Sequence, residues 1–180
     1  MTKAVSVRRV GAEEAAALIE GLADVLVDCV EGGASVGFML PLPRAKALAF
    51  WRGVAEAVAR RERLLLVAED VAGRVVGTVQ LIMALPENQP HRGDVAKMLV
   101  RCDARRQGIA QRLMAALDDA ARAEGKAVLV LDTVTGGDAE RLYERAGWQR
   151  VGVVPQYALM PTGGFCSTTF FYKHIPAPSR

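Results

Sequence analysis

The sequence predicts an α/β (α+β) fold in which a mixed central sheet of about seven strands is flanked by helices. Two observations support this prediction. From Val95 to Asp132 the chain reads as an apolar strand, a basic glycine-containing turn, an amphipathic helix and a second apolar strand, which is typical of one βαβ unit. Along the whole chain, segments with helical spacing and segments of strand length follow in the order β α α β β β α β α β β.

Length and composition indicate one ordinary domain. The chain has 180 residues, of which 51% are hydrophobic and 24% charged, as in soluble globular proteins. We expect a single domain over residues 1–175 and a frayed tail over residues 176–180, with no membrane span. The N-terminal stretch MTKAVSVRRV lacks the apolar core of a secretory signal, so the expected location is the cytoplasm.

In the N-terminal half, the pattern predicts a strand, two helices and a hairpin. Apolar residues at helical spacing continue to Val30, and Gly32-Gly33 ends that helix. The apolar segment that follows, GASVGFMLPLP, has neither helical nor strand periodicity. It therefore either lines a pocket or packs against the rest of the protein. The expected elements are a strand at 4–10, helices at 12–30 and 44–60, and strands at 64–68 and 74–85.

In the C-terminal half, fully apolar strands alternate with amphipathic helices. Gly125 closes the longer of these helices, and Asp138 is the expected N-cap of the shorter one. The last two strands are joined by a long connection over residues 155–167. The expected elements are strands at 95–100 and 127–131, helices at 108–124 and 138–146, and strands at 149–154 and 168–175.

The turn after the strand at 95–100 carries the first functional signal. Its sequence, Arg105-Arg106-Gln107-Gly108-Ile109-Ala110, places two arginines and a glycine at the start of a helix. Helix N-termini leave backbone N–H groups unpaired and carry partial positive charge, so they attract phosphate. Glycine lets a ligand approach the backbone closely, and the arginines add donors and charge. On the pattern alone, a plain tight turn with solvated arginines stays open as the alternative.

This turn fits the pattern Q/R-x-x-G-x-G/A and resembles the pyrophosphate loop of the GCN5-related N-acetyltransferases (GNAT), whose order of elements is also similar. The resemblance implies acetyl-CoA as co-substrate and a gap between splayed fourth and fifth strands that receives its pantetheine arm. It also implies that backbone N–H groups hold the thioester carbonyl and the pyrophosphate. The cofactor-binding residues implied in this way are Met98, Leu99 and Val100 on the fourth strand, and Arg105, Arg106, Gln107, Gly108, Ile109, Ala110 and Gln111 at the turn.

Longer stretches resemble one subgroup, the tabtoxin-resistance acetyltransferases. These stretches are GGASVGFM at 32–39, VLDT at 130–133, the helix that ends in Tyr143, and YALMPTGG…TTFFYK near the C-terminus. The resemblance implies acetyl transfer to the amino group of tabtoxinine-β-lactam or a similar amino-acid-like toxin or antibiotic, which is a resistance function. Arg106, where many relatives have glycine, and the loop at 85–93 depart from the pattern. The resemblance therefore supports the cofactor better than it supports the substrate.

Two residues are candidates for the catalytic chemistry. Tyr143 is expected on the inner face of the short helix, and its phenol, with an ordinary pKa of about 10, would stay protonated and able to donate to a leaving thiolate. Asp132 ends the fifth strand, where it could bind the substrate ammonium or accept its proton. From the residues alone, Tyr143 could instead be a core aromatic residue and Asp132 could cap the following turn. The resemblance favours Tyr143 as the general acid.

Other classes of function fit the sequence less well. Cys29, Cys102 and Cys166 are odd in number and widely spaced, and the two histidines are too few for a cluster, so we expect no metal. A net charge of +3 gives no reason to expect nucleic acid, and neither a GK[ST] loop nor G-x-G-x-x-G is present. We expect a monomer or homodimer that acts on a small-molecule amine. The alternatives are another amine acceptor (an antibiotic, a polyamine or a protein terminus) and a non-catalytic acyl-CoA-binding sensor.

Overall fold

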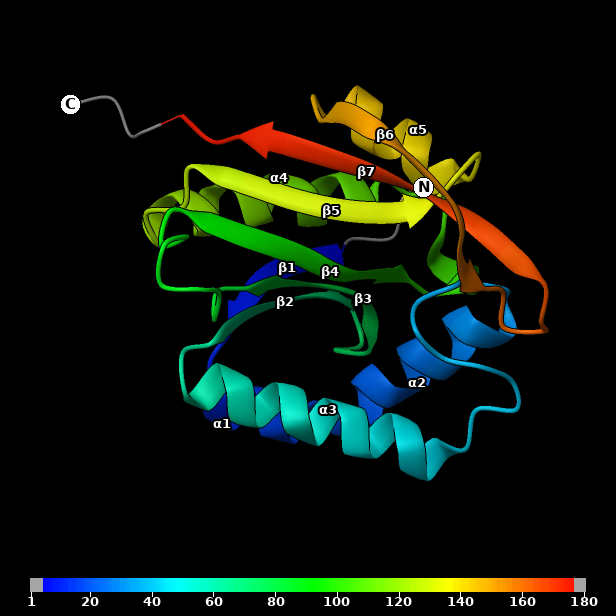
Figure 1. The fold of residues 1–180 in the computed structure, drawn as a ribbon. Coiled ribbons are helices and arrows are strands. Elements are labelled where there is room, and N and C mark those ends of the chain that lie inside the picture. Colours follow the sequence, from blue (N-terminus) through cyan, green and yellow to red (C-terminus); the bar gives the residue numbers. More distant parts are fainter. Residues whose placement is uncertain (1–4, 177–180) are drawn as a thin grey trace.

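The computed structural model describes residues 5–176. Figure 1 shows one twisted sheet with helices on both of its faces. In chain order the elements are β1 (Val5–Val10), α1 (Ala12–Ala17), α2 (Ile19–Glu31), α3 (Arg44–Ala59), β2 (Arg63–Asp70), β3 (Val75–Ile82), β4 (Arg92–Val100), the 3-10 turn η1 (Cys102–Ala104), α4 (Ile109–Ala123), β5 (Val128–Val134), α5 (Asp138–Arg145), β6 (Gln149–Leu159) and β7 (Phe165–His174).

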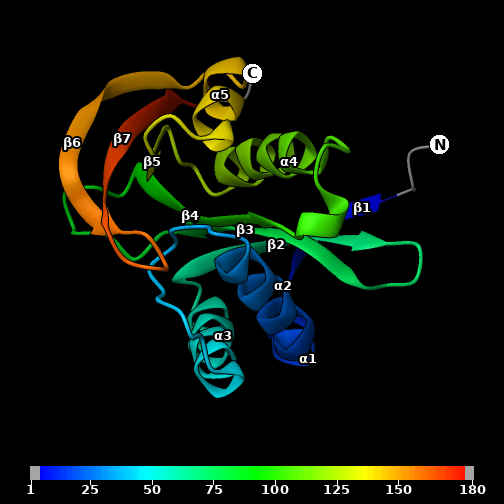
Figure 2. The same cartoon turned by 90° about the vertical axis from the view of Figure 1, so that its right-hand side faces the viewer.

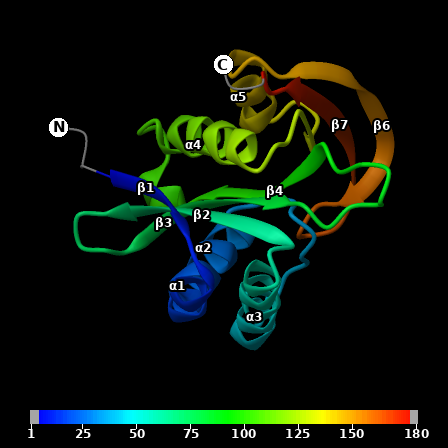
Figure 3. The same cartoon turned by 90° about the vertical axis from the view of Figure 1, so that its left-hand side faces the viewer.

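The sheet has seven strands in the order β1-β2-β3-β4-β5-β7-β6. All neighbouring pairs are antiparallel except β4 and β5, which are parallel and are connected by α4. Figure 2 shows α1, α2 and α3 on one face of the sheet and α4 and α5 on the other. Figure 3 shows β1 at one end of the sheet and β6 at the other. This mixed sheet with flanking helices confirms the predicted fold class.

Each face of the sheet has its own hydrophobic core, because successive side chains of a strand point to opposite faces. On the face covered by α4 and α5, which we call the α4 face, Leu64 and Leu66 pack with residues of α4. On the face covered by α1, α2 and α3, which we call the α3 face, Leu65 and Val67 pack around Trp51. The central strands are therefore buried on both sides and provide a rigid support for the segment between β4 and β5.

The parallel strands β4 and β5 pair only at their beginnings. Residues 92–94 of β4 align with residues 128–130 of β5. Beyond these pairs β4 continues to Val100, whereas the rest of β5 up to Val134 pairs with β7 alone. The two strands therefore diverge toward their carboxyl ends, as expected from the resemblance, and leave an opening in the sheet.

Several predicted boundaries were wrong. The helix predicted at 12–30 is interrupted at Leu18, where φ is −93° and ψ is 1°, although Leu18 still donates to the carbonyl of Glu14. The connection predicted at 155–167 is mostly strand, because the β6–β7 hairpin continues to the pair Leu159 and Phe165 past irregularities in register that hide the alternation. Gly137, and not Asp138, is the N-cap of α5. Of the predicted tail, residues 177–180 lie outside the described part of the chain.

Candidate active site

The anion-binding turn is open to solvent at the N-terminus of α4. Gly108 has a φ of +74°, in the left-handed region that favours glycine, and forms the N-cap of the helix. A Cβ built on Gly108 would meet no atom within 4 Å, so the space in front of the backbone is free. Arg105, Arg106 and Gln111 are exposed around it. The first N–H groups of α4 and two guanidinium groups are thus available to an anion such as a pyrophosphate.

Contacts with the end of β4 and with α2 fix the position of this turn. Arg105 Nε donates to the carbonyl oxygen of Val100 at 3.3 Å, and the backbone N–H of Cys102 donates to Asp28 Oδ2 at 2.7 Å. Cys29 Sγ lies 3.4 Å from the same Val100 oxygen. Cys102 is exposed, and partial burial of its sulfur raises the pKa of the thiol above its ordinary value. The contacts assign Cys102 to the packing of the turn against α2.

Strand β4 contains a bulge beside the opening. The register of the β3–β4 pair shifts between Thr78 and Gln80, because two residues along β3 correspond to three residues along β4. Lys97 lies in the bulge with a φ of +51°. A bulge interrupts the ladder and leaves an unpaired backbone group, which is the feature expected for residues 98–100. Met98 and Val100 pack against the α4-face core and Leu99 belongs to the α3-face core, so the bulged segment borders both faces.

Tyr143 lies on the α4 face in an aromatic cluster. Its ring centroid is 6.0 Å from those of Trp148 and Phe171, and the residue is only 5% exposed. Burial, and then the negative charge of Asp132, raise the pKa of Tyr143 above its ordinary value of 10.0. The phenol therefore stays protonated at neutral pH. The side chain is both part of the core and electrostatically coupled to the carboxylate at the opening.

Asp132 lies on β5 beyond its last pair with β4. The residue is exposed, and its Oδ2 lies 2.9 Å from Thr168 Oγ1 of β7, whose one hydroxyl proton it shares with the carbonyl oxygen of Thr133 at 2.8 Å. Leu129 and Leu131 belong to the α4-face core, so alternation directs Asp132 to the α3 face. The carboxylate is thus held by the neighbouring strand, and its second oxygen is left for a ligand.

Sequence reasoning missed three polar residues on the α3 face near the opening: Arg63 of β2, Gln80 of β3 and Lys97 of β4. Arg63 Nη1 donates to Gln80 Oε1 at 2.6 Å, and Lys97 Nζ lies 5.5 Å from the centroid of the Phe50 ring. Burial lowers the pKa of Lys97, Arg63 lowers it further, and Asp132 raises it. The available signal was a lysine in the otherwise apolar run VAKMLV, but only the strand register shows which residues surround it.

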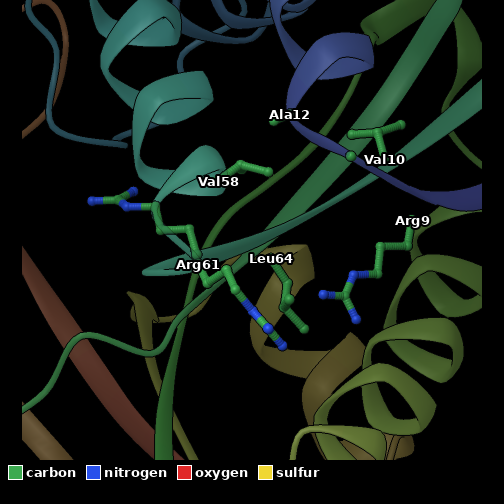
Figure 4. A pocket seen from close by; sticks show the side chains of 8 residues that line it. Arg9, Val10, Ala12, Val58, Arg61 and Leu64 are labelled. Carbon is green, nitrogen blue, oxygen red and sulfur yellow. The ribbon is translucent and has the colours of Figure 1, made fainter.

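Two hollows lie along α3. One of about 300 Å³, shown in Figure 4, is bordered by Arg9, Arg61 and Arg63 at the end of the sheet near β1, and no predicted site residue lines it. The other, of about 400 Å³, lies between α3 and the β2–β3 pair and is lined in part by Phe50 and Arg63. The second hollow therefore shares two residues with the surroundings of Lys97.

The described residues 5–176 contain no group of three or more His, Cys, Asp or Glu side chains that could hold a metal ion. Over the same range, no helix combines the length and the apolarity needed to cross a membrane.

Fold and site together fit the class of acyl-CoA-dependent transferases expected from the sequence, and comparison with known proteins gives the family. Residues 60–150 match the acetyltransferase (GNAT) domain family. Over 116 residues the chain is 33% identical to "Uncharacterized N-acetyltransferase in hisH-hisA intergenic region" of Azospirillum brasilense, an alignment that covers 63% of this chain and 67% of that protein. The chain belongs to the GNAT family and is an N-acetyltransferase of that family.

Solved structures share the whole fold. The N-acetyltransferase from Staphylococcus aureus Mu50 superposes with a TM-score of 0.78 at 18% identity, covering 96% of this chain and 99% of that one. The structure of yncA from Salmonella typhimurium with its cofactor acetyl-CoA gives 0.77 at 20% identity, covering 98% and 97%. A GCN5-related N-acetyltransferase from Kribbella flavida gives 0.77 at 21% identity, covering 95% and 98%. At these identities the likeness supports the fold, and acetyl-CoA is the co-substrate that fits it.

Proposed function

We propose that the protein is a cytoplasmic enzyme that transfers the acetyl group of acetyl-CoA to the amino group of a small amino-acid-like molecule, with tabtoxinine-β-lactam as the first acceptor to test. The observation that supports this proposal is the divergence of β4 and β5 beside the bulge in β4, with the exposed carboxylate of Asp132 on β5 and the buried phenol of Tyr143 close enough for that charge to raise its pKa. The choice of acceptor rests on the sequence resemblance at 32–39 and 130–133.

The residues at the end of β4 fit acetyl-CoA. Backbone N–H groups from Arg105 to Gln111 would hold the pyrophosphate, and an N–H group of Met98, Leu99 or Val100 would hold the thioester carbonyl. The free space in front of Gly108 supports this fit, because a phosphate must approach the backbone there. When bound, acetyl-CoA supplies the acetyl group as a reactive thioester.

Asp132 would accept a proton from the acceptor, and Tyr143 would donate one to the leaving thiolate. Asp132 would bind the acceptor ammonium, take one proton and pass it on to solvent, which leaves a neutral amine able to attack the thioester carbonyl directly. As the C–N bond forms and the C–S bond breaks, Tyr143 would give its phenolic proton to the departing sulfur. The proton lost by the new amide nitrogen would restore the phenol, directly or through water. The raised pKa of Tyr143 supports this role, because the proton is present at neutral pH.

The test is release of the coenzyme A thiol from acetyl-CoA, with tabtoxinine-β-lactam and a panel of simple amines as acceptors. Release with the toxin would support a resistance enzyme. Release only with other amines, such as a polyamine or an N-terminal peptide, would support acetyl transfer but overturn the proposed acceptor. Tight binding of acetyl-CoA without release with any acceptor would favour a sensor and overturn the proposal.

A further inference from the structure

Three polar side chains form a row across the sheet on the α3 face. Gln80 aligns with Leu65 on β2 and with Ala96 on β4, so Arg63, Gln80 and Lys97 occupy neighbouring positions on three successive strands. Asp132 of β5 follows on the far side of the opening, close enough to Lys97 for its charge to affect the pKa of that lysine. The row therefore leads from the interior of the α3 face to the proposed amine site.

Several hydrogen-bond donors and positive charges of this row have no partner among the described residues. Gln80 is fully buried, its Oε1 is occupied by Arg63, and its Nε2 has no hydrogen-bond partner among the residues that the structure describes. Over residues 5–176, neither Arg63 nor Lys97 has a carboxylate oxygen within 4.0 Å. A buried amide donor without a partner costs free energy, and so does a half-buried ammonium without a counter-charge. Such a set is typical of a site whose missing partner is an anionic ligand.

An aromatic ring and a loop lie close to the ammonium group of Lys97. The ammonium lies over the ring of Phe50, and a Cβ built on Gly37 would be 3.9 Å from Lys97 Nζ, so the loop between α2 and α3 passes beside it. Phe50 and Arg63 also line the hollow of about 400 Å³ under α3. The positive φ of Lys97 comes from the bulge that borders the opening, so the conformation that interrupts the ladder also sets the position of the lysine.

We infer that the acceptor carries a carboxylate or another anionic group close to its amine, and that Lys97 binds this group with the help of Arg63 and Gln80 while the amine lies at Asp132. This inference rests on the proposed function and names its substrate class: amino acids and related zwitterions, and not polyamines or simple alkylamines. Lys97 then determines specificity, since an acceptor without the anion leaves the ammonium and the Gln80 amide unpaired.

The test compares wild type with Lys97→Met, which keeps the length of the side chain and removes its charge. The matched control is Lys46→Met, because Lys46 is an exposed lysine of α3 whose Nζ also lies over a phenylalanine ring, that of Phe38, at 5.9 Å. The probes are tabtoxinine-β-lactam and three matched compounds: L-leucine, its amide L-leucinamide, and isopentylamine, which lacks the carboxyl group.

For wild type we expect the amino acids to be used with higher kcat/KM than the amide or the alkylamine. Lys97→Met should lower kcat/KM for the amino acids about 10- to 100-fold, the loss expected for a charge-assisted hydrogen bond, and change the values for the amide and the alkylamine less than about threefold. The KM for acetyl-CoA and the values for Lys46→Met should not change. Equal losses for all acceptors, or a wild-type preference for uncharged or polycationic amines, would overturn the inference.

A second readout does not depend on turnover. Sodium succinate, compared with sodium chloride at the same ionic strength, should raise the Tm of wild type and of Lys46→Met by roughly 3 °C at about ten times its Kd, and should not raise that of Lys97→Met. A shift that persists in Lys97→Met, or no shift in wild type, would count against the anion site. If no amine is acetylated but the lysine-dependent shift occurs, the proposed function fails and the anion site stands.

Discussion

The two faces of the opening between β4 and β5 are built in different ways. On the α4 face, the groups proposed to hold acetyl-CoA come from one continuous stretch, residues 98–111, and most of them are backbone N–H groups. On the α3 face, the groups proposed to hold the acceptor are the side chains of Arg63, Gln80, Lys97 and Asp132, which come from four different strands. The proposed cofactor site is therefore formed by the backbone of neighbouring residues. The proposed acceptor site depends on side chains that lie together only because of the register of the strands.

The largest expected effect concerns Tyr143, the proposed proton donor, whose ring is buried on the α4 face. Tyr143→Phe removes only the hydroxyl and keeps the ring packed against Trp148 and Phe171, so kcat should fall about 10²- to 10⁴-fold while the Kd for acetyl-CoA stays the same. Steady-state thiol release and acetyl-CoA titration measure the two quantities. The control is Tyr157→Phe, an exposed tyrosine on β6. An unchanged kcat would assign Tyr143 to the core alone.

The next effect concerns the α3 face. Asp132→Asn can still accept the hydrogen bond from Thr168, but it can neither take a proton nor attract an ammonium group, so kcat/KM for the acceptor should fall about 10²-fold. The measurement is thiol release at varied acceptor concentration. Asp138→Asn, at the exposed start of α5, is the control. A similar loss in both variants, or a loss confined to the KM for acetyl-CoA, would remove Asp132 from the acceptor site.

A smaller effect concerns the α4 face. Gly108→Ala should raise the Kd for acetyl-CoA about tenfold, because the residue must hold a φ of +74° and would present a methyl group to the incoming phosphate. Gly73→Ala is a matched control, since Gly73 has a φ of +76° in the β2–β3 turn and equally free space around it. Both variants should lose roughly 1–2 kcal/mol of stability from the strain. Equal acetyl-CoA affinity in the two variants would contradict the role of the turn.

The smallest effect is on stability at high pH. Because the pKa of Tyr143 is higher in the folded protein than its ordinary value of 10.0, the unfolded chain releases this proton first as pH rises. The free energy of unfolding should therefore fall above pH 10, by about 1 kcal/mol per pH unit for this one group. In Tyr143→Phe that slope should be smaller by the same amount. Urea unfolding of both proteins at a series of pH values measures it, with Tyr157→Phe as control.

The parts that the sequence predicted are those with local causes. The spacing of apolar residues located α4 and α5, and the glycine-containing turn at 105–110 located an open helix N-terminus, because both depend on neighbours in the chain. The order of elements, read with the GNAT resemblance, also led to the correct sheet and to the divergence of β4 and β5.

What the sequence did not predict depends on pairing between distant segments. β4 begins at Arg92, before the predicted strand, because residues 92–94 pair with β5 although two of the three are charged. The row of Arg63, Gln80 and Lys97 was missed for the same reason: each residue is unremarkable in its own segment, and only the register of β2, β3 and β4 brings them to one face.

We expect acetyl-CoA to enter from the α4 face and the acceptor from the α3 face, so that the two meet at the opening. A crystal structure of the protein with coenzyme A and an N-acetylated amino acid tests it most directly. We expect the pyrophosphate at the N–H groups of residues 105–111, the coenzyme A sulfur near the Tyr143 hydroxyl, and the carboxylate of the product within hydrogen-bond distance of Lys97 Nζ. Coenzyme A bound elsewhere, or a product carboxylate that faces solvent away from Lys97, would rule out this arrangement of the two substrates.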